Sequence, residues 1–272
     1  MEEKKGTYKE NFARIETKYM LSRQQYDRLM KQLEDYVEPD EYGDTRIYNI
    51  YYDTPNYRLI RESIEKPTYK EKLRLRTYLV PDSESNSFVE IKKKYKGVVY
   101  KRRIGMPYGM AKAHLDTGKH FEDADEERTT QSFVDAQIGS EIDSFTDYYD
   151  ALVPKMVISY DRLAFRGKED PDFRVTFDTH ITWRCDHLDL QEGGYGEELL
   201  EEGNRLMEIK CGGAIPKEVA AILSKEEIYQ TSYSKYGSAY REYVKGMRVC
   251  RMATGQAKVE NRKGEKGLCL NT

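Results

Sequence analysis

The chain has 272 residues, which allows one large domain or two smaller ones. It carries 45 Lys and Arg against 48 Asp and Glu, for a formal net charge of −3, so no overall basic excess favours nucleic acid or an anionic membrane as a partner. Charged residues make up 34% of the chain and aromatic residues 12%, including 23 Tyr. This aromatic content excludes a disordered chain and indicates a fold with an unusually polar core.

Alternation of polar and apolar residues dominates the first hundred positions and predicts a strand-rich segment. Ser22 is a suitable N-cap for a helix that follows the first strand. The expected strands are residues 14–20, 46–52, 69–78, 88–95 and 98–105, and a second short helix is expected at 56–63. The last two strands are separated by Lys96 and Gly97, which predicts a hairpin.

Residues 107–152 change to helical spacing and include an acidic run at 121–128. We expect a helical insertion there, on the outside of the fold. Beyond it, strands are expected at 155–165, 173–183 and 205–210, and helices at 216–223 and 234–244. Residues 1–11 are expected to be flexible and residues 247–272 disordered. The chain has no long apolar run and no signal-peptide pattern, which predicts a cytoplasmic protein without membrane insertion.

Five of the expected strands have one apolar and one charged face. In the segment KLRLR, Lys72, Arg74 and Arg76 share one face, and Leu73 and Leu75 share the other. The same separation places Arg14, Glu16 and Lys18 opposite Ile15; Glu90 and Lys92 opposite Val89 and Ile91; Arg174, Thr176 and Asp178 opposite Val175 and Phe177; and Glu208 and Lys210 opposite Met207 and Ile209.

One interpretation is that these charged faces point into water from a half-exposed sheet. The other is that the helices cover the apolar faces, so that the charges line the inside. The second interpretation predicts an α+β fold: a closed eight-stranded antiparallel β-barrel with a polar, charged lumen and helices packed outside. Arg and Lys in such a lumen would bind a polyanion, and Glu16, Glu90 and Glu208 would hold Mg²⁺ or Mn²⁺.

Seven short motifs occur in order: R-x-E-x-K-Y, K-x-R-x-R, E-x-K, SYDRLAF, FRVTFD, LMEIK and YSKY. Together, over residues 12–246, they resemble the catalytic domain of VTC polyphosphate polymerases in the CYTH-like superfamily of triphosphate tunnel metalloenzymes. The resemblance implies a tunnel domain at 12–246 that adds the γ-phosphoryl group of ATP to inorganic polyphosphate, a transferase reaction with a divalent metal. The expected ligands are ATP, polyphosphate and pyrophosphate.

The resemblance also implies roles for individual residues. The basic positions that contact phosphate in the family correspond to Lys18, Arg74, Arg76, Lys92, Lys101, Arg162, Arg174 and Lys235, and the metal-binding glutamate corresponds to Glu208. Lys210 lies beside Glu208 on the same face. Lys72, Lys94 and Arg103 fit the alternation with weaker support from the family. Asp178 suits a structural partner of a neighbouring Arg equally well.

We expect Arg74, Arg76, Arg162 and Arg174 to hold the nucleotide phosphates. Lys18, Lys92, Lys101 and Lys235 are expected to guide the product chain. Arg14 stands where the superfamily's hydrolases have the first glutamate of E-x-E-x-K, which argues against the triphosphatase and cyclase branches. Two alternatives remain: a tunnel-type triphosphatase acting on inorganic or organic triphosphate, and a polyphosphate- or pyrophosphate-binding module without activity.

Overall fold

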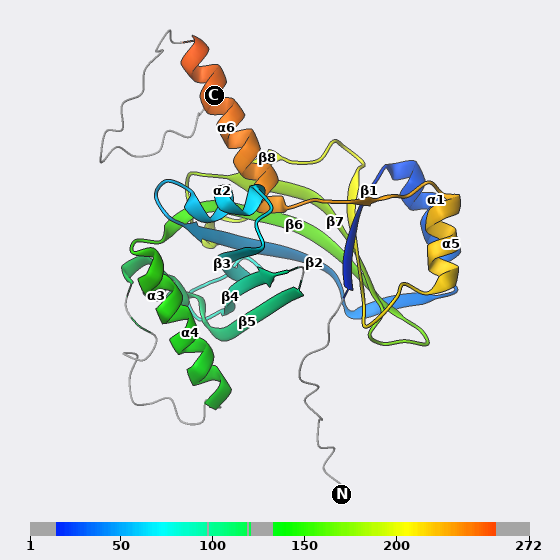
Figure 1. Ribbon diagram of the computed structural model, residues 1–272, viewed down its shortest axis with the longest axis horizontal. Helices are drawn as coiled ribbons and strands as arrows, with labels where there is room; N and C mark the ends of the chain where they lie inside the picture. The colour runs from blue at the N-terminus through cyan, green and yellow to red at the C-terminus, as the bar shows by residue number, and fades with distance from the viewer. Residues whose placement is uncertain (1–14, 97, 119, 121–132, 254–272) are drawn as a thin grey trace, which may run out of the picture. The chain divides into compact units, whose positions relative to one another are not determined.

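The computed structural model describes residues 15–96, 98–118, 120 and 133–253 (Figure 1). Several sequence predictions therefore lie outside the described residues: the flexible segment 1–11, Arg14, Gly97, the acidic run at 121–128 and the tail from 254 onward. The chain divides into two compact units. Unit 1 comprises Met1–Asp44, Leu163–Phe177 and Gly203–Ser232, and unit 2 comprises Thr45–Arg162, Asp178–Glu202 and Tyr233–Thr272.

Within the described residues the sheet has ten strands and is open. The strands are β1 (Ile15–Leu21), β2 (Val37–Asp53), β3 (Tyr69–Thr77), β4 (Asn86–Tyr95), β5 (Val98–Pro107), β6 (Val153–Gly167), β7 (Arg174–Arg184), β8 (Glu197–Glu198), β9 (Arg205–Cys211) and β10 (Gln230–Thr231). They pair in the order β10-β1-β9-β7-β6-β2-β3-β4-β5, and β8 pairs with β7. Among the described residues β5 and β10, the two ends of this order, do not pair with each other. The prediction of a closed eight-stranded barrel is therefore wrong, whereas the α+β class and the strand-rich character are confirmed.

The described helices follow the predicted positions closely. They are α1 (Arg23–Leu33), α2 (Arg58–Ile64), α3 (Tyr108–Thr117), α4 (Phe133–Tyr149), the 3-10 helix η2 (Leu190–Glu192), α5 (Lys217–Lys225) and α6 (Lys235–Ala253). Helix α6 continues nine residues beyond the predicted end at 244. The rest of the predicted tail, 254–272, lies outside the described residues. In the part of the chain that the structure describes, no helix combines the length and the apolar character needed to cross a bilayer.

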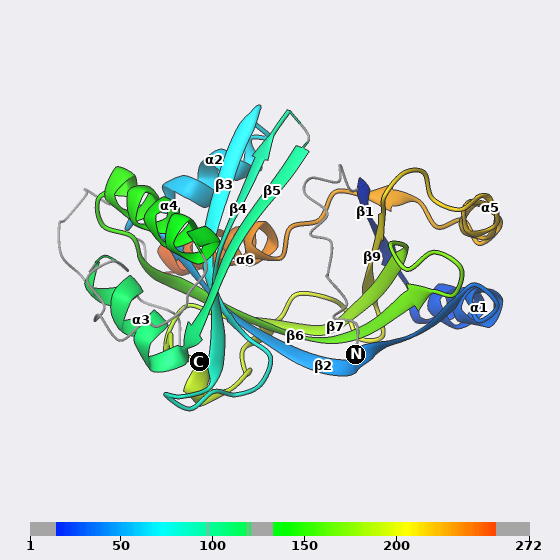
Figure 2. The ribbon, with the colours of Figure 1, turned by 90° about the horizontal axis from the view of Figure 1, so that it is seen from below.

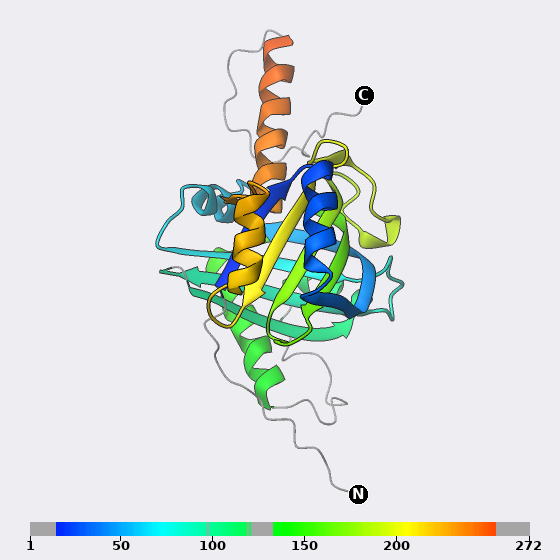
Figure 3. The same ribbon diagram turned by 90° about the vertical axis from the view of Figure 1, so that its right-hand side faces the viewer.

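Unit 1 is held together by a core between its strands and two helices. Ser22 begins α1 as predicted: its hydroxyl accepts a hydrogen bond from the Gln25 amide, and the Gln25 side chain accepts one from the Ser22 amide. Helices α1 and α5 lie side by side over β1 and β9 (Figure 3). The core joins these helices to the predicted apolar faces of β7 and β9; its members include Leu29, Leu33, Val175, Phe177, Ile209, Val219 and Leu223.

Unit 2 has its own core, on one face of β3, β4 and β5. Leu73 and Leu75 are fully buried there against residues of α3 and α4, including Leu115 and Ile142. Figure 2 shows both helices on the same side of these strands. The helices of the predicted insertion thus supply seven of the nineteen buried residues of this core. In both units the helices cover the apolar strand faces, which leaves the opposite, charged faces to form the candidate site.

Candidate functional site

Strands β3, β4 and β5 of unit 2 present one strongly cationic face. Directly paired residues of antiparallel strands lie on the same face, and the register pairs Lys72 with Lys92 and Lys92 with Lys101. Extending this register gives eight cationic side chains on one face, which we call the basic face: Lys70, Lys72, Arg74, Arg76, Lys92, Lys94, Lys101 and Arg103. Glu90 is the only carboxylate on the same face of these three described strands.

Glu90 organises the centre of the basic face. Its side chain is 1% exposed, and its Oε2 accepts a hydrogen bond from Arg74 Nε at 2.7 Å. Its Oε1 lies 2.6 Å from Lys101 Nζ and 3.9 Å from Arg103 Nη1. Burial acts to raise the pKa of Glu90, but Arg74, Arg76 and Lys101 lower it far below its usual range. The carboxylate is thus ionised and surrounded by cations of the protein, and its predicted role as a metal ligand stays a prediction.

Tyr160 is the centre of a second group of cations in unit 2. Arg76 Nη2 donates a hydrogen bond of 2.9 Å to the Tyr160 hydroxyl, and Arg76 Nε donates one to Asn49 Oδ1. Lys235 Nζ lies 4.2 Å and Arg162 Cζ 5.2 Å from the centre of the Tyr160 ring. Although burial acts to raise it, these three cations lower the pKa of Tyr160 to about 8. Three cations within reach of one side chain make the local potential positive, which is the property an anion site needs.

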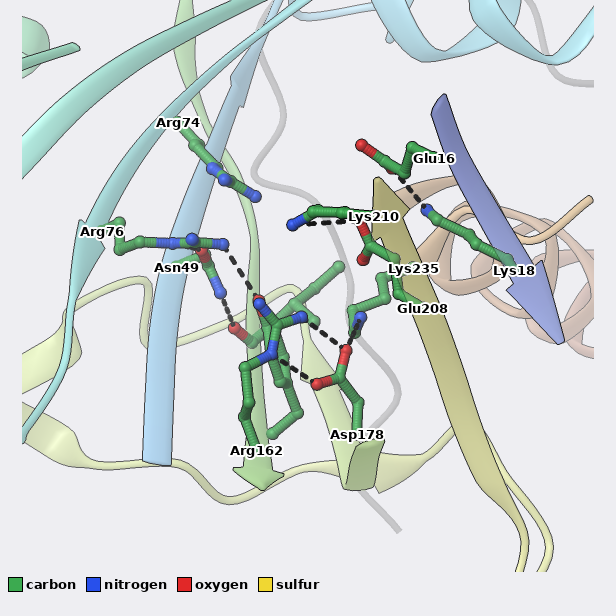
Figure 4. A network of polar contacts seen from close by, with 12 residues as sticks. Glu16, Lys18, Asn49, Arg74, Arg76, Arg162, Asp178, Glu208, Lys210 and Lys235 are labelled. Carbon is green, nitrogen blue, oxygen red and sulfur yellow. Dashed lines mark hydrogen bonds and ion pairs between the residues drawn. The ribbon is translucent and has the colours of Figure 1, made fainter. Parts of the chain in front are cut away.

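Asp178 joins two of these cations. Its Oδ1 accepts a hydrogen bond of 2.6 Å from Arg162 Nε and its Oδ2 one of 2.8 Å from Arg162 Nη2, which forms a bidentate pair. Lys235 Nζ donates to the same Oδ2 at 2.5 Å (Figure 4). Burial opposes ionisation, but Lys235 and Arg162 lower the pKa of Asp178 to about 2. These contacts are those of a structural partner of a neighbouring Arg, the alternative role that the sequence suggested for Asp178.

Unit 1 carries a separate group of four charges on β1 and β9, which we call the charged quartet. The register pairs Glu16 with Lys210 and Lys18 with Glu208, so all four side chains share one face. Lys210 Nζ lies 3.2 Å from Glu208 Oε1, and Lys18 Nζ lies 3.7 Å from Glu16 Oε1 (Figure 4). The Glu208 side chain is only 8% exposed.

Three more predicted site residues, Lys72, Lys94 and Arg174, lie outside the groups around Glu90, Tyr160 and Asp178. Lys72 belongs to the basic face, and its Nζ donates a hydrogen bond of 2.9 Å to Ser234 Oγ, next to the start of α6. Lys94 lies at the exposed end of the same face. Arg174 lies in unit 1, is 46% exposed, and has its Nη1 3.7 Å from Asp40 Oδ2. Its predicted grouping with Arg74, Arg76 and Arg162, all in unit 2, stays a prediction.

The structure adds neutral residues that the sequence analysis had not assigned to the site. Asn49 and Tyr160 orient Arg76, and the hydroxyl of Tyr51 accepts from Arg74 Nη1 at 3.4 Å. The ring of Tyr236 stacks on Tyr51 with centroids 4.5 Å apart. Tyr160 stands two positions before Arg162 on the same strand, so the alternation of β6 contained a signal for it. No comparable signal marked Asn49 and Tyr51.

The sequence of these charged strands lies within a match to a known family. The VTC domain family matches residues 13–244. The chain belongs to the VTC domain family. No curated protein matches this VTC domain in sequence.

We compare it with two of the solved structures that are similar to it. One is a proposed adenylate cyclase from Vibrio parahaemolyticus, at 10% identity and a TM-score of 0.43, covering 84% of this chain and 98% of the other. The other is a proposed adenylyl cyclase from Hippeastrum described as having a dominant triphosphatase activity, at 13% identity and a TM-score of 0.43, covering 84% of this chain and 96% of the other.

Proposed function

We propose that this VTC domain is a polyphosphate polymerase that transfers the γ-phosphoryl group of ATP to a growing inorganic polyphosphate chain. The observation that carries the proposal is the basic face, where eight cations and one carboxylate share the same face of three adjacent described strands. At about 3.3 Å per residue, Lys72 to Arg76 spans roughly 13 Å, enough to contact several linked phosphates. A single small carboxylate substrate would need far fewer cations.

In the proposed reaction a terminal oxygen of the polyphosphate chain attacks the γ-phosphorus of ATP. The bond from this phosphorus to the bridging oxygen breaks, and ADP leaves with the bond's electrons. Such a transfer needs little covalent help from the protein, because in-line placement and neutralisation of charge supply most of the catalysis. Arg74, Arg76 and Arg162 suit this role since guanidinium groups bind phosphate oxygens in pairs.

The positions of these arginines are set before any substrate arrives. Glu90 holds Arg74, Tyr160 and Asn49 hold Arg76, and Asp178 holds Arg162. Fixed cations lower the free energy of the transition state more than mobile ones, because no reorganisation is needed during the reaction. Lys92, Lys101 and Lys235 are proposed to bind the phosphate chain, together with Lys72, Lys94 and Arg103 at the margins of the basic face.

The charged quartet suits a hard divalent cation. Mg²⁺ is usually bound through one or two carboxylates, while water and substrate phosphates complete its ligands. Glu208 and Glu16 share one face of β1 and β9 and provide such oxygens; among the described residues no group of three or more His, Cys, Asp or Glu forms a full protein cage. We propose Glu208 as the principal ligand for Mg²⁺ or Mn²⁺, with Lys18 and Lys210 as phosphate-binding neighbours. The metal would neutralise charge on phosphate oxygens.

Incubation with γ-labelled ATP and Mn²⁺ or Mg²⁺, followed by a sizing gel, tests the proposed function. A polymerase produces labelled, acid-stable polymer and ADP in matching amounts. A triphosphatase produces labelled orthophosphate alone, and a binding module produces neither; both outcomes contradict the proposal.

Arg74→Ala should abolish polymer formation. Glu90 keeps its contact with Lys101 in this variant, so the fold should persist. Arg102→Ala is the matched control, because Arg102 belongs to the same hairpin but its register places it on the opposite face, where it pairs with Glu141. Equal loss of activity in both variants would show that the basic face has no special role.

A further inference from the structure

Unit 2 contains a cavity on the side of β3 opposite to the basic face. Its volume is about 630 Å³, within the range of small-molecule sites. Strand β3 and helix α4 provide much of its lining, including Glu71, Tyr69, Tyr148 and Tyr149. Because side chains alternate along a strand, Glu71 points away from the face that carries Lys70 and Lys72. A ligand of this cavity would therefore not occupy the phosphate-binding face.

Glu71 is a buried carboxylate without a cationic partner. The residue is 8% exposed. The hydroxyl of Tyr149 donates a hydrogen bond of 2.6 Å to its Oε1, and the hydroxyl of Tyr69 donates to its Oε2. Among the described residues no ion pair reaches Glu71, although Lys93 lies directly opposite in the register. Removing a carboxylate from water without a counter-charge is costly, so a cation entering the cavity would be attracted to this group.

The aromatic residues around Glu71 suit a cation with an organic body. The ring of Tyr149 lies 4.9 Å from the rings of both Phe145 and Tyr148. One protein cation already uses these rings: Arg58 Cζ lies 5.4 Å from the centre of Tyr149 and 5.9 Å from that of Tyr148. Aromatic faces attract cations through their quadrupole, most effectively where water is excluded. Among the described residues no three His, Cys, Asp or Glu side chains are grouped so that they could hold a bare metal ion.

We propose that this cavity binds an organic ammonium ion, with its nitrogen against Glu71 and its alkyl groups against the tyrosine rings. The cavity volume, the buried unpaired carboxylate and the aromatic walls all favour this class of ligand. Arg58 does not replace the ligand, because its Nε is engaged by Glu62 at 2.9 Å. This site is independent of the proposed polymerase reaction.

Isothermal titration of the full chain with tetramethylammonium and with n-butylammonium chloride, at constant total chloride, tests the proposal. Saturable binding of at least one probe is expected. Glu71→Gln should weaken it at least tenfold, and Tyr148→Ala about fivefold. Tyr148 is 68% exposed, so its loss should leave the fold intact even if Glu71→Gln disturbs it; circular dichroism checks both variants.

A third variant distinguishes a cation site from an anion site by the direction in which the affinity for ammonium changes. Lys93→Met removes a positive charge from the lining and should tighten ammonium binding severalfold. Lys94→Met is the matched control, because the neighbouring position points to the opposite face and should leave ammonium binding unchanged. The proposal is overturned if neither probe binds, if Glu71→Gln and Tyr148→Ala bind as the wild type does, or if Lys93→Met weakens binding.

Discussion

Replacing Asp178 by Asn should destabilise the protein strongly and make its stability depend on an added polyanion. Asp178 is fully buried and pairs with Arg162 and Lys235, whose side chains are 17% and 11% exposed. Removing one member of a buried ionic group costs about 3–5 kcal/mol, because the remaining charges stay buried without compensation. At roughly 2–4 °C per kcal/mol, the melting temperature should fall by on the order of 10 °C.

The pKa of Asp178 also predicts how much its ionisation contributes to the stability of the fold, and how that contribution changes with pH. Its folded value of about 2 lies below the ordinary 3.8, so ionisation stabilises the fold by about 2 kcal/mol. This stability is present above pH 3.8 and is lost as the pH falls through 2. Asp178→Asn should therefore flatten the acid side of the stability profile.

Thermal unfolding followed by circular dichroism at pH 7, with and without tripolyphosphate at matched ionic strength, measures the effect. The anion should raise the melting temperature of Asp178→Asn more than that of the wild type, since phosphate replaces the missing charge beside Arg162 and Lys235. Asp27→Asn, at an exposed position of α1, is the control and should change stability by less than about 0.5 kcal/mol. Equal shifts by tripolyphosphate in wild type and Asp178→Asn would refute the reasoning.

Three further predictions concern single residues. Partial burial lowers the pKa of Lys101 to about 8 despite the opposing effect of Glu90. The affinity for tripolyphosphate should therefore fall as the pH rises from 7 to 9, and it should fall less in Lys101→Arg. Identical pH profiles of affinity in the two proteins would contradict this prediction. Glu208→Gln should raise the Mn²⁺ concentration needed for half-maximal activity at least tenfold, and an unchanged metal titration would remove Glu208 as a ligand. Ser22→Ala should reduce the free energy of unfolding by about 1 kcal/mol through loss of the cap, with specific activity unchanged; denaturant titration and the polymer assay check both parts.

The strand faces could be predicted from the sequence because alternation fixes them. Leu73 and Leu75 are buried as expected, which directs Arg74 and Arg76 to the other face. The hairpin predicted near Lys96 has Tyr95 paired with Val98, and this register brings Lys101 and Arg103 to Glu90. Local rules therefore specify most of the basic face.

Other features depend on contacts between distant segments. Strand β2 begins at Val37, nine residues before the predicted start. Its first part contains Pro39 and Gly43, residue types that are typical of turns, and Gly43 has a φ of +51°. The group around Tyr160 combines residues from β2, β3, β6, β7 and α6, and no periodicity relates these elements. The closed barrel was inferred from the charged strand faces and from helices able to cover the apolar faces. Closure depends instead on pairing between the two end strands of the sheet, β5 and β10, which no local pattern encodes.

A crystal structure of the chain with bound tripolyphosphate is the most direct test of the claim that the charged strand faces bind a phosphate chain. Phosphate oxygens should lie within hydrogen-bond distance of Arg74 and of Arg76 or Arg162. A tripolyphosphate seated away from the basic face and from the group around Tyr160, with these arginines keeping only their contacts to Glu90, Tyr160 and Asp178, would contradict the account.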